Sequence, residues 1–172
     1  GKCSRPTAHE ILLADAPGVE AMEKLFQRLD DLLFCIKDRE GCYLSANDAF
    51  LRRARVEDPR DLIGRTAKEF FPPLLAAGYE QQDTGVTLRG EETRDRLEMI
   101  TNSDGGVGWY LSDKIPIRNR DGDVIGIAGM SRDLRSSADN DPRYAKLASV
   151  IDHMREHYDE PLRIGQLGAR TD

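Results

Sequence analysis

The stretch from Trp109 to Leu134 constrains the fold of this 172-residue chain more than any other feature of the sequence. From position 109 to 117, apolar residues alternate with other residues at most positions, which is the period of a half-buried antiparallel strand. A second run, 124–130, is apolar or glycine at every position, as expected of a central strand covered on both faces. The Asp-Gly pair at 121–122 between these runs predicts a hairpin. A sheet is therefore expected to form around this hairpin.

Three further segments have the composition of strands, namely Leu32 to Asp38, Cys42 to Ala46 and Thr93 to Thr101. Helices are predicted between them. Thr7 and Glu10 form a capping-box pattern before a short helix that ends ahead of Pro17. Further on, Asn47 or Asp48 is predicted to cap a helix, short helices follow near 59–71, and a longer helix runs from Pro73 to Leu88 with an interruption near Gly85.

Several motifs occur in the order found in one known family. They are Cys42 to Asn47, Leu62 to Thr66, Phe70 to Pro72, Lys114 to Ile117, Asp121-Gly122, Ile125 to Ile127 and Arg132 to Leu134. Together they resemble a PAS sensor domain over roughly residues 20 to 135. Such domains commonly end in Asp-Ile-Thr, and here the matching positions read Asp133-Leu134-Arg135.

The resemblance implies an α+β PAS fold: a five-stranded antiparallel sheet flanked by short helices, with the 124–132 strand in the middle. We expect an N-terminal extension with a short helix over 1–18, the PAS domain over 19–135 and a C-terminal helical extension. A linker over 136–142 is predicted from its Ser, Asp, Asn and Pro content.

The segment 143–172 resembles the beginning of an AraC-type helix-turn-helix domain, in its helix with Val150-Ile151 and Glu156 to Tyr158 and in Glu160-Pro161-Leu162. The sequence therefore predicts a sensor domain of an AraC-family transcription regulator, in which DNA is contacted only through the remainder of that domain. Two alternatives stay open. The chain is then either a PAS dimerisation module without a ligand, or the sensor domain of a histidine kinase or a cyclic-dinucleotide enzyme.

Composition argues against several other functions. The net charge of -6 is unsuited to binding nucleic acid. No catalytic triad, phosphate loop or metal-binding pair is found, so no enzymatic activity and no metal site are predicted. The three histidines, His9, His153 and His157, lie outside the predicted sensor core, which disfavours haem, and the Asn-Cys motif of the photoactive flavin branch is missing. Three cysteines give no disulfide framework. Without a long apolar run or a signal segment, we expect a cytoplasmic protein with no membrane contact.

A ligand pocket is predicted between the sheet and the helices, because concave apolar sites with a few polar groups are the usual small-molecule sites. The candidate lining residues are Phe34, Phe70, Leu75, Tyr79, Met99, Trp109, Leu111, Asp113 and Ile127. The alternative is that these residues are ordinary core. The resemblance further implies that Arg132 and Asp133 transfer the signal out of the domain.

The segment around residues 19–29 carries apolar residues at spacings of three and four, which predicts one apolar helix face, formed by Val19, Met22, Leu25, Phe26 and Leu29. Such a helix either lies on its own sheet or forms a homodimer contact, as N-terminal helices do in many PAS domains.

Overall fold

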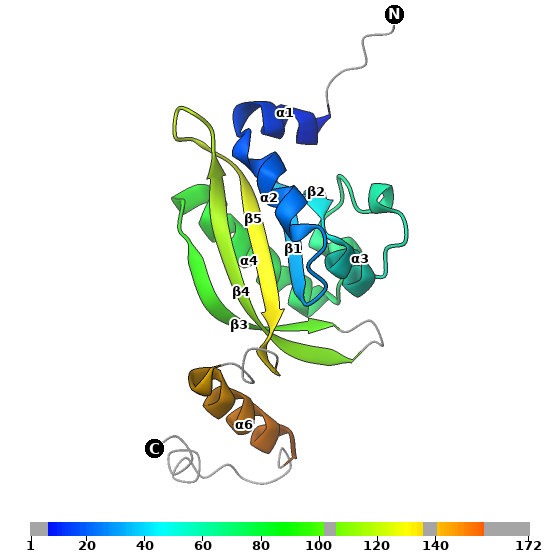
Figure 1. Cartoon of the computed structure of the whole chain (residues 1–172), viewed down its shortest axis with the longest axis vertical. Coiled ribbons are helices and arrows are strands. Elements are labelled where there is room, and N and C mark those ends of the chain that lie inside the picture. Colours follow the sequence, from blue (N-terminus) through cyan, green and yellow to red (C-terminus); the bar gives the residue numbers. More distant parts are fainter. Residues whose placement is uncertain (1–6, 102–105, 136–140, 157–172) are drawn as a thin grey trace, which may run out of the picture.

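The computed structural model describes residues 7–101, 106–135 and 141–156, and its centre is one antiparallel sheet (Figure 1). The strands follow the order β2-β1-β5-β4-β3. Their bounds are β1 Leu32–Asp38, β2 Tyr43–Ala46, β3 Thr93–Thr101, β4 Val107–Arg118 and β5 Val124–Asp133. The glycine-rich strand β5 is therefore central, paired with β1 on one side and β4 on the other, which confirms the prediction from its continuous apolar run.

The predicted hairpin joins β4 and β5. The Asn119 side chain accepts hydrogen bonds from the backbone N–H groups of Asp121 and Asp123. Gly122 has a φ of 88°, a conformation in which a side chain would be strained. The turn residues therefore fix the register that places β5 in the middle of the sheet.

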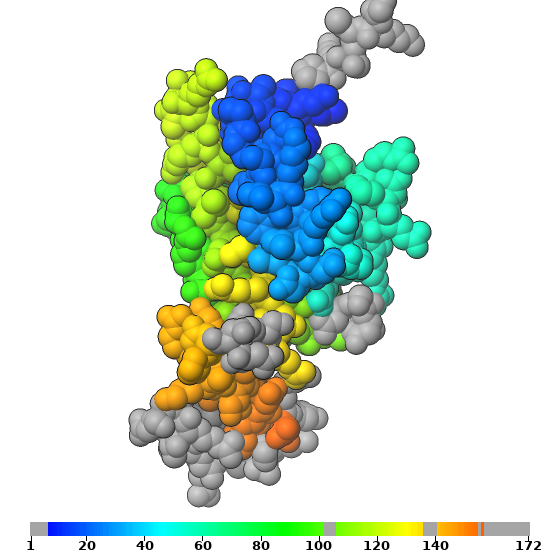
Figure 2. Space-filling view, in the orientation of Figure 1, coloured from blue at the N-terminus to red at the C-terminus, as the bar shows by residue number. Residues whose placement is uncertain are grey.

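Helices cover both faces of the sheet. On one face lie α1 (Ala8–Asp15) and α2 (Gly18–Phe26), shown in blue in Figures 1 and 2, which form an apolar core with β1 and β5. The other face carries α3 (Asp48–Ala54), the short 3-10 helices η1 (Pro59–Asp61) and η2 (Ala67–Glu69), and α4 (Pro73–Arg89). The helix α6 (Pro142–Glu156) packs at the end of the sheet, against Leu111 and Leu134 (Figure 2).

Asn47 joins three of these elements. Its Oδ1 atom accepts hydrogen bonds from the backbone N–H groups of Phe50, in the first turn of α3, and of Phe34 in β1. Its Nδ2 atom lies within hydrogen-bond distance of the carbonyl oxygens of Phe26, Leu29 and Leu32. The predicted cap is confirmed, and the same side chain also fixes the end of α2 against the sheet.

Two helices differ from the prediction. The helix α4 continues through Gly85 to Arg89, so the predicted interruption is wrong; a side chain at Gly85 would meet the Arg89 guanidinium, and the helix tolerates the glycine there. The helix predicted to reach Leu29 ends at Phe26. The capping box of Thr7 and Glu10 is present, as predicted.

Most of the predicted linker and of the segment with the AraC-type resemblance, 136–140 and 157–172, lies outside the described residues. Within the described ranges, no helix combines the length and the apolar character required to cross a bilayer.

Candidate functional site

A cavity lies between the sheet and the helices α3 and α4. Its volume is about 60 Å³. For comparison, a cavity of about 150 Å³ accommodates benzene, so this one holds a smaller molecule unless side chains move. The lining residues are Leu33, Cys35, Lys37, Tyr43, Phe50, Arg53, Phe71, Tyr79, Glu98, Ile100, Lys114, Gly129, Met130 and Ser131.

One side of this cavity is a buried charge cluster. Asp83 of α4 accepts from Lys37 Nζ at 2.6 Å and from Lys114 Nζ at 2.7 Å. The side chains of Lys37 and Asp83 are each 6% exposed, and that of Lys114 is 11% exposed. Two ammonium groups share one carboxylate, so the cluster carries a net charge of +1 in a site with little water.

The opposite charges in the cluster stabilise the ionised forms of Asp83 and Lys37. Burial alone would raise the pKa of the Asp83 carboxyl, but the ammonium groups of Lys37 and Lys114 outweigh burial and hold that pKa below its usual value. Burial alone would lower the pKa of Lys37, yet the neighbouring Tyr43 and Asp83 raise it above its usual value. Asp83 and Lys37 are therefore both ionised near neutral pH.

Lys114 is the member of the cluster best placed to bind a ligand. An ammonium group has three N–H donors. Within the described part of the chain, Lys114 Nζ has two acceptors, Asp83 Oδ1 and the Tyr79 carbonyl oxygen at 3.4 Å. A third N–H remains for an acceptor group of a molecule in the cavity that Lys114 lines.

Gly129 of β5 lines the cavity, and because glycine has no side chain it leaves space there. A methyl group built on Gly129 would lie 3.7 Å from the Cys35 Sγ atom and 3.9 Å from Lys114 Cγ. Burial raises the pKa of the Cys35 thiol to about 11, so this sulfur stays protonated and unreactive at neutral pH. Gly129 and Cys35 thus shape the cavity rather than perform chemistry in it.

Of the nine pocket residues predicted from the sequence, Tyr79 alone lines this cavity. Phe34, Trp109 and Leu111 lie on the opposite face of the sheet, against α2 or α6. Met99 pairs with Trp109 across the strands, and its side chain is partly exposed. The Asp113 carboxylate accepts a hydrogen bond from the Asp95 backbone N–H at 2.7 Å, so the carboxylate has a donor outside the cavity.

The other three residues do not line the cavity either. Phe70 packs beside Tyr43, with ring centroids 6.1 Å apart, in an apolar cluster that also contains the lining residues Phe71 and Tyr79. Leu75 is half-buried on α4. Ile127 is buried opposite Lys37 in the sheet.

The predicted residues differ from the lining of this cavity because the prediction concerns the other face of the sheet. Side chains on a strand alternate between faces, so a set assigned to the wrong face is wrong throughout. The apolar alternation from Trp109 faces α6 and the N-terminal helices, whereas the intervening Ser112 and Lys114 face the cavity side. Polar residues within otherwise apolar strands, notably Lys37, Ser112 and Lys114, are the sequence signal that indicates the cavity face.

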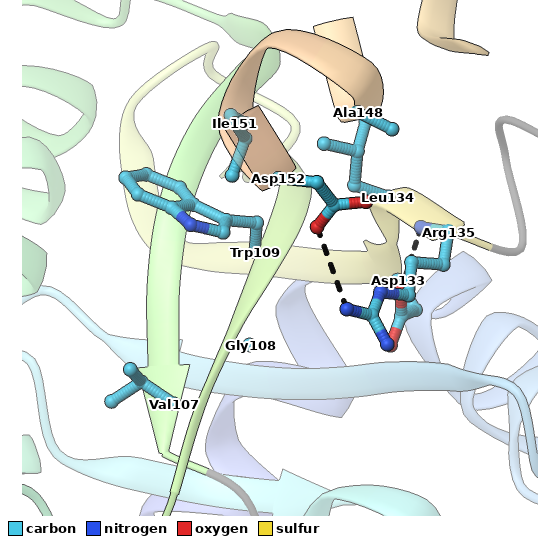
Figure 3. Close-up of a pocket in the computed structure, with 9 residues that line it drawn as sticks. All are labelled: Val107, Gly108, Trp109, Asp133, Leu134, Arg135, Ala148, Ile151 and Asp152. Carbon is cyan, nitrogen blue, oxygen red and sulfur yellow. Dashed lines mark hydrogen bonds and ion pairs between the residues drawn. The ribbon is translucent and has the colours of Figure 1, made fainter. Parts of the chain in front are cut away.

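A second cavity, of about 170 Å³, lies where α6 meets the sheet (Figure 3). Trp109 of β4 and Ile151 of α6 both line it, and Arg135 forms an ion pair with Asp152 at 3.5 Å. The predicted signal-transfer residue Asp133 also lines this cavity, and its carboxylate accepts from the Arg135 backbone.

Arg132, the other predicted signal-transfer residue, connects three elements. It forms an ion pair with Asp95 of β3, and its guanidinium carbon lies 5.8 Å from the centre of the Tyr144 ring in α6. Both residues predicted for signal transfer thus lie at the contact between the sheet and α6; their role in transfer stays a prediction.

The residues predicted for a dimer contact divide into two groups. Val19 is buried, and Met22 and Phe26 pack on the core of the same chain, so α2 lies on its own sheet. Leu25 and Leu29 are exposed, at 74% and 40%. In the described residues, no group of three or more His, Cys, Asp or Glu side chains is arranged to hold a metal ion.

The five-stranded sheet with its flanking helices, and the family comparison, define the class of this protein. The sequence model of the PAS fold matches residues 26–139, and the chain belongs to the PAS fold family.

Solved structures with the same fold include structures of the regulator VqmA. The VqmA dimer of Vibrio cholerae, described as a LuxR-type receptor, is similar with a TM-score of 0.59 and 28% identity, over 70% of this chain and 52% of that one. VqmA bound to DPO gives a TM-score of 0.57 and 27% identity, over 67% and 56%. This chain thus matches about half of the length of VqmA.

The PAS domain of Bordetella pertussis BvgS is a further structural relative. It has a TM-score of 0.58 and 22% identity, over 81% of this chain and 98% of that one, a likeness that concerns the fold. The comparison with curated proteins found no match.

Proposed function

We propose that this PAS domain is the ligand-sensing module of a transcription regulator, and that a small polar molecule binds in the cavity beside Lys114. The observation that carries the proposal is the buried cluster of Lys37, Asp83 and Lys114. Its net positive charge and its remaining N–H donor lie against a cavity that Gly129 keeps open. Such a group is suited to bind a carbonyl, hydroxyl or other acceptor of a ligand. The proposed role is binding and not catalysis.

Two structures of VqmA support a regulatory role. One is bound to DPO, and another is described as a complex with ligand and DNA. DPO and DNA are partners of VqmA. The ligand of this chain is to be identified by experiment.

The strand β5 offers a route by which binding reaches the output. Gly129 and Ser131 line the cavity, and Asp133 and Leu134 follow directly at the contact with α6. A ligand that favours one arrangement of β5 would shift the population of that contact, and a ligand with equal affinity for both arrangements would transmit nothing.

For the output we further propose an AraC-type DNA-binding domain, on the resemblance of segment 143–172. The coding sequence downstream of position 172 tests this assignment. Two helix-turn-helix motifs would support it, and a kinase or cyclic-dinucleotide domain would contradict it.

A thermal-shift screen of small polar metabolites tests ligand binding. Wild type is compared with Lys114→Met and with the control Lys68→Met, whose side chain is exposed beside Glu80. We expect compounds that raise the melting temperature of wild type and Lys68→Met but not of Lys114→Met. Equal stabilisation of all three proteins, or stabilisation by no compound, would contradict the proposal.

The second candidate function, a dimerisation module, is favoured by the exposed Leu25 and Leu29 on the N-terminal helical segment. We propose that the domain forms a homodimer through this surface, which is compatible with ligand binding on the opposite face of the sheet.

A further inference from the structure

Glu98 of β3 is a buried acidic residue that lines the cavity, and one of its two carboxyl oxygens has no hydrogen-bond partner in the described structure. The residue is 7% exposed, and its Oε1 atom is fully buried with no hydrogen bond. It forms no ion pair with any residue in the described ranges 7–101, 106–135 and 141–156. A carboxylate removed from water without a donor costs folding free energy, so this position is unfavourable for the empty domain.

The neighbours of Glu98 do not relieve this cost. Tyr110 lies directly across the strand pair, and its hydroxyl is likewise buried without a hydrogen-bond partner in the described structure. The guanidinium of Arg53 lies over the Tyr110 ring, with its central carbon 4.9 Å from the ring centre. The two lysines of the cavity are engaged with Asp83.

Glu98 and the lysine cluster therefore form two different regions of one cavity. Lys114 is four residues along β4 from Tyr110, the strand partner of Glu98, which corresponds to about 14 Å along the strand. One region offers N–H donors from lysine, and the other offers a carboxylate that requires a donor.

We propose that Glu98 selects the ligand by accepting a hydrogen bond from it. The ligand class is then small, neutral or cationic molecules that carry an N–H or O–H donor for Glu98. Molecules that have only acceptors, simple carboxylates among them, are disfavoured because they leave the buried Glu98 oxygen without a donor. This inference rests on the proposed ligand-binding function and adds the chemistry of the ligand.

Three probes of equal heavy-atom number isolate this requirement. Acetone has an acceptor only, acetamide replaces one methyl by a donating NH₂ group, and acetate replaces it by a charged oxygen. Binding is measured by NMR titration of the ¹⁵N-labelled full chain, with amide signals of cavity residues as the readout. We expect acetamide to bind about tenfold or more tightly than acetone, because a hydrogen bond to a charged group contributes that ratio. Acetate is expected to bind least well.

Two variants assign the preference to Glu98. In Glu98→Leu the preference for acetamide over acetone should vanish, while the melting temperature stays equal to or above that of wild type, because a buried polar group without a hydrogen bond is removed. In Glu98→Gln the new amide donates as well as accepts, so acetone should gain affinity relative to acetamide. The control Glu92→Gln, which changes an exposed carboxylate near the start of β3, should retain the wild-type preference.

The outcomes separate this inference from the proposed function. Equal binding of acetone and acetamide to wild type, with both weakened by Lys114→Met, would overturn the role of Glu98 and leave the proposed function in place. An unchanged acetamide preference in Glu98→Leu and Glu98→Gln would also overturn it. The absence of binding by all three probes would contradict both.

Discussion

Lys37 of β1 and Asp83 of α4 form an ion pair in which the nitrogen and oxygen atoms are 2.6 Å apart. Each of the two side chains is 6% exposed. The two residues are 46 positions apart in the sequence, and Lys114 joins them from a third element. The cluster therefore links β1, β4 and α4 around the cavity. Its energetics and its position lead to the following expectations.

Loss of Asp83 alone should be strongly destabilising. Asp83→Asn leaves two buried ammonium groups without their counter-ion, and the free energy of unfolding should fall by about 3–5 kcal/mol. The triple variant Lys37→Met, Asp83→Leu, Lys114→Met removes all three charges and should stay within about 1–2 kcal/mol of wild type. Urea denaturation followed by circular dichroism measures both. The exposed pair of Asp30 and Arg52 supplies the control Asp30→Asn, with an effect of about 0.5 kcal/mol or less. A triple variant as unstable as Asp83→Asn would refute this reading.

The same cluster should impose a defined pH dependence. The pKa of Asp83 is lowered in the folded state, so its stabilisation is present above the unfolded value of about 3.9 and is lost as pH falls through the lower folded value. The pKa of Lys37 is raised, so its stabilisation is present below about 10.4 and declines only at higher pH. The stability of wild type relative to the triple variant should thus be constant from about pH 5 to 9 and fall below about pH 4. Urea midpoints across this range test it, and a relative stability of wild type that rose on acidification would be incompatible.

Two glycines of β5 should respond in opposite ways to alanine. A methyl group on Gly129 would have ordinary contacts and enter the cavity, so Gly129→Ala should keep the stability of the fold or raise it by about 0.4–1 kcal/mol while weakening ligand binding. A methyl group on Gly126 would lie 2.6 Å from the Lys37 carbonyl oxygen, so Gly126→Ala should destabilise by about 1–3 kcal/mol. Thermal denaturation compares the pair. Equal effects of the two substitutions would show that the cavity floor is misplaced.

The packing of α6 should be visible in the fluorescence of Trp109, the single tryptophan of the chain. Ile151 is buried against the sheet, and Ile151→Asp should release α6 and shift the emission of Trp109 to longer wavelength as water reaches the indole. Met154 of the same helix is partly exposed, so Met154→Asp should leave the spectrum unchanged. An unaltered spectrum in Ile151→Asp would mean that α6 does not pack on Trp109 in solution.

A homodimer through the surface of Leu25 and Leu29 should be visible in the mass in solution. Size-exclusion light scattering is expected to give twice the chain mass for wild type and the single mass for Leu25→Asp with Leu29→Asp, since charges would be buried in the contact. Leu74→Asp, at an exposed leucine of α4, is the control and should remain dimeric. A monomeric wild type at all concentrations would remove the dimer proposal.

The sequence was sufficient for the fold but not for the site. The turn at Asn119 to Asp123 and the continuous apolar run of β5 are local signals, and local signals determined the hairpin and the central strand. Which side of a strand faces a cavity depends on what covers each face, and that is set by distant elements such as α6. For this reason Trp109 was assigned to the pocket and Lys114 was not.

The contact of Lys37, Asp83 and Lys114 could not be predicted from the sequence either. No pattern of spacing indicates that three charged residues on separate elements meet. A location between the sheet and the helices is predictable because concave apolar sites are the usual small-molecule sites, and Tyr79, one of the predicted residues, lines the cavity.

The central claim is that the cavity over Gly129 is where a small molecule binds. The most direct measurement is an ¹H–¹⁵N NMR titration of the full chain with acetamide. The account predicts shifts centred on the backbone amides of Cys35, Gly129 and Ser131, reduced in Lys114→Met and Gly129→Ala. Shifts centred on Trp109 and Ile151 at the α6 contact, or no shifts at all, would contradict it.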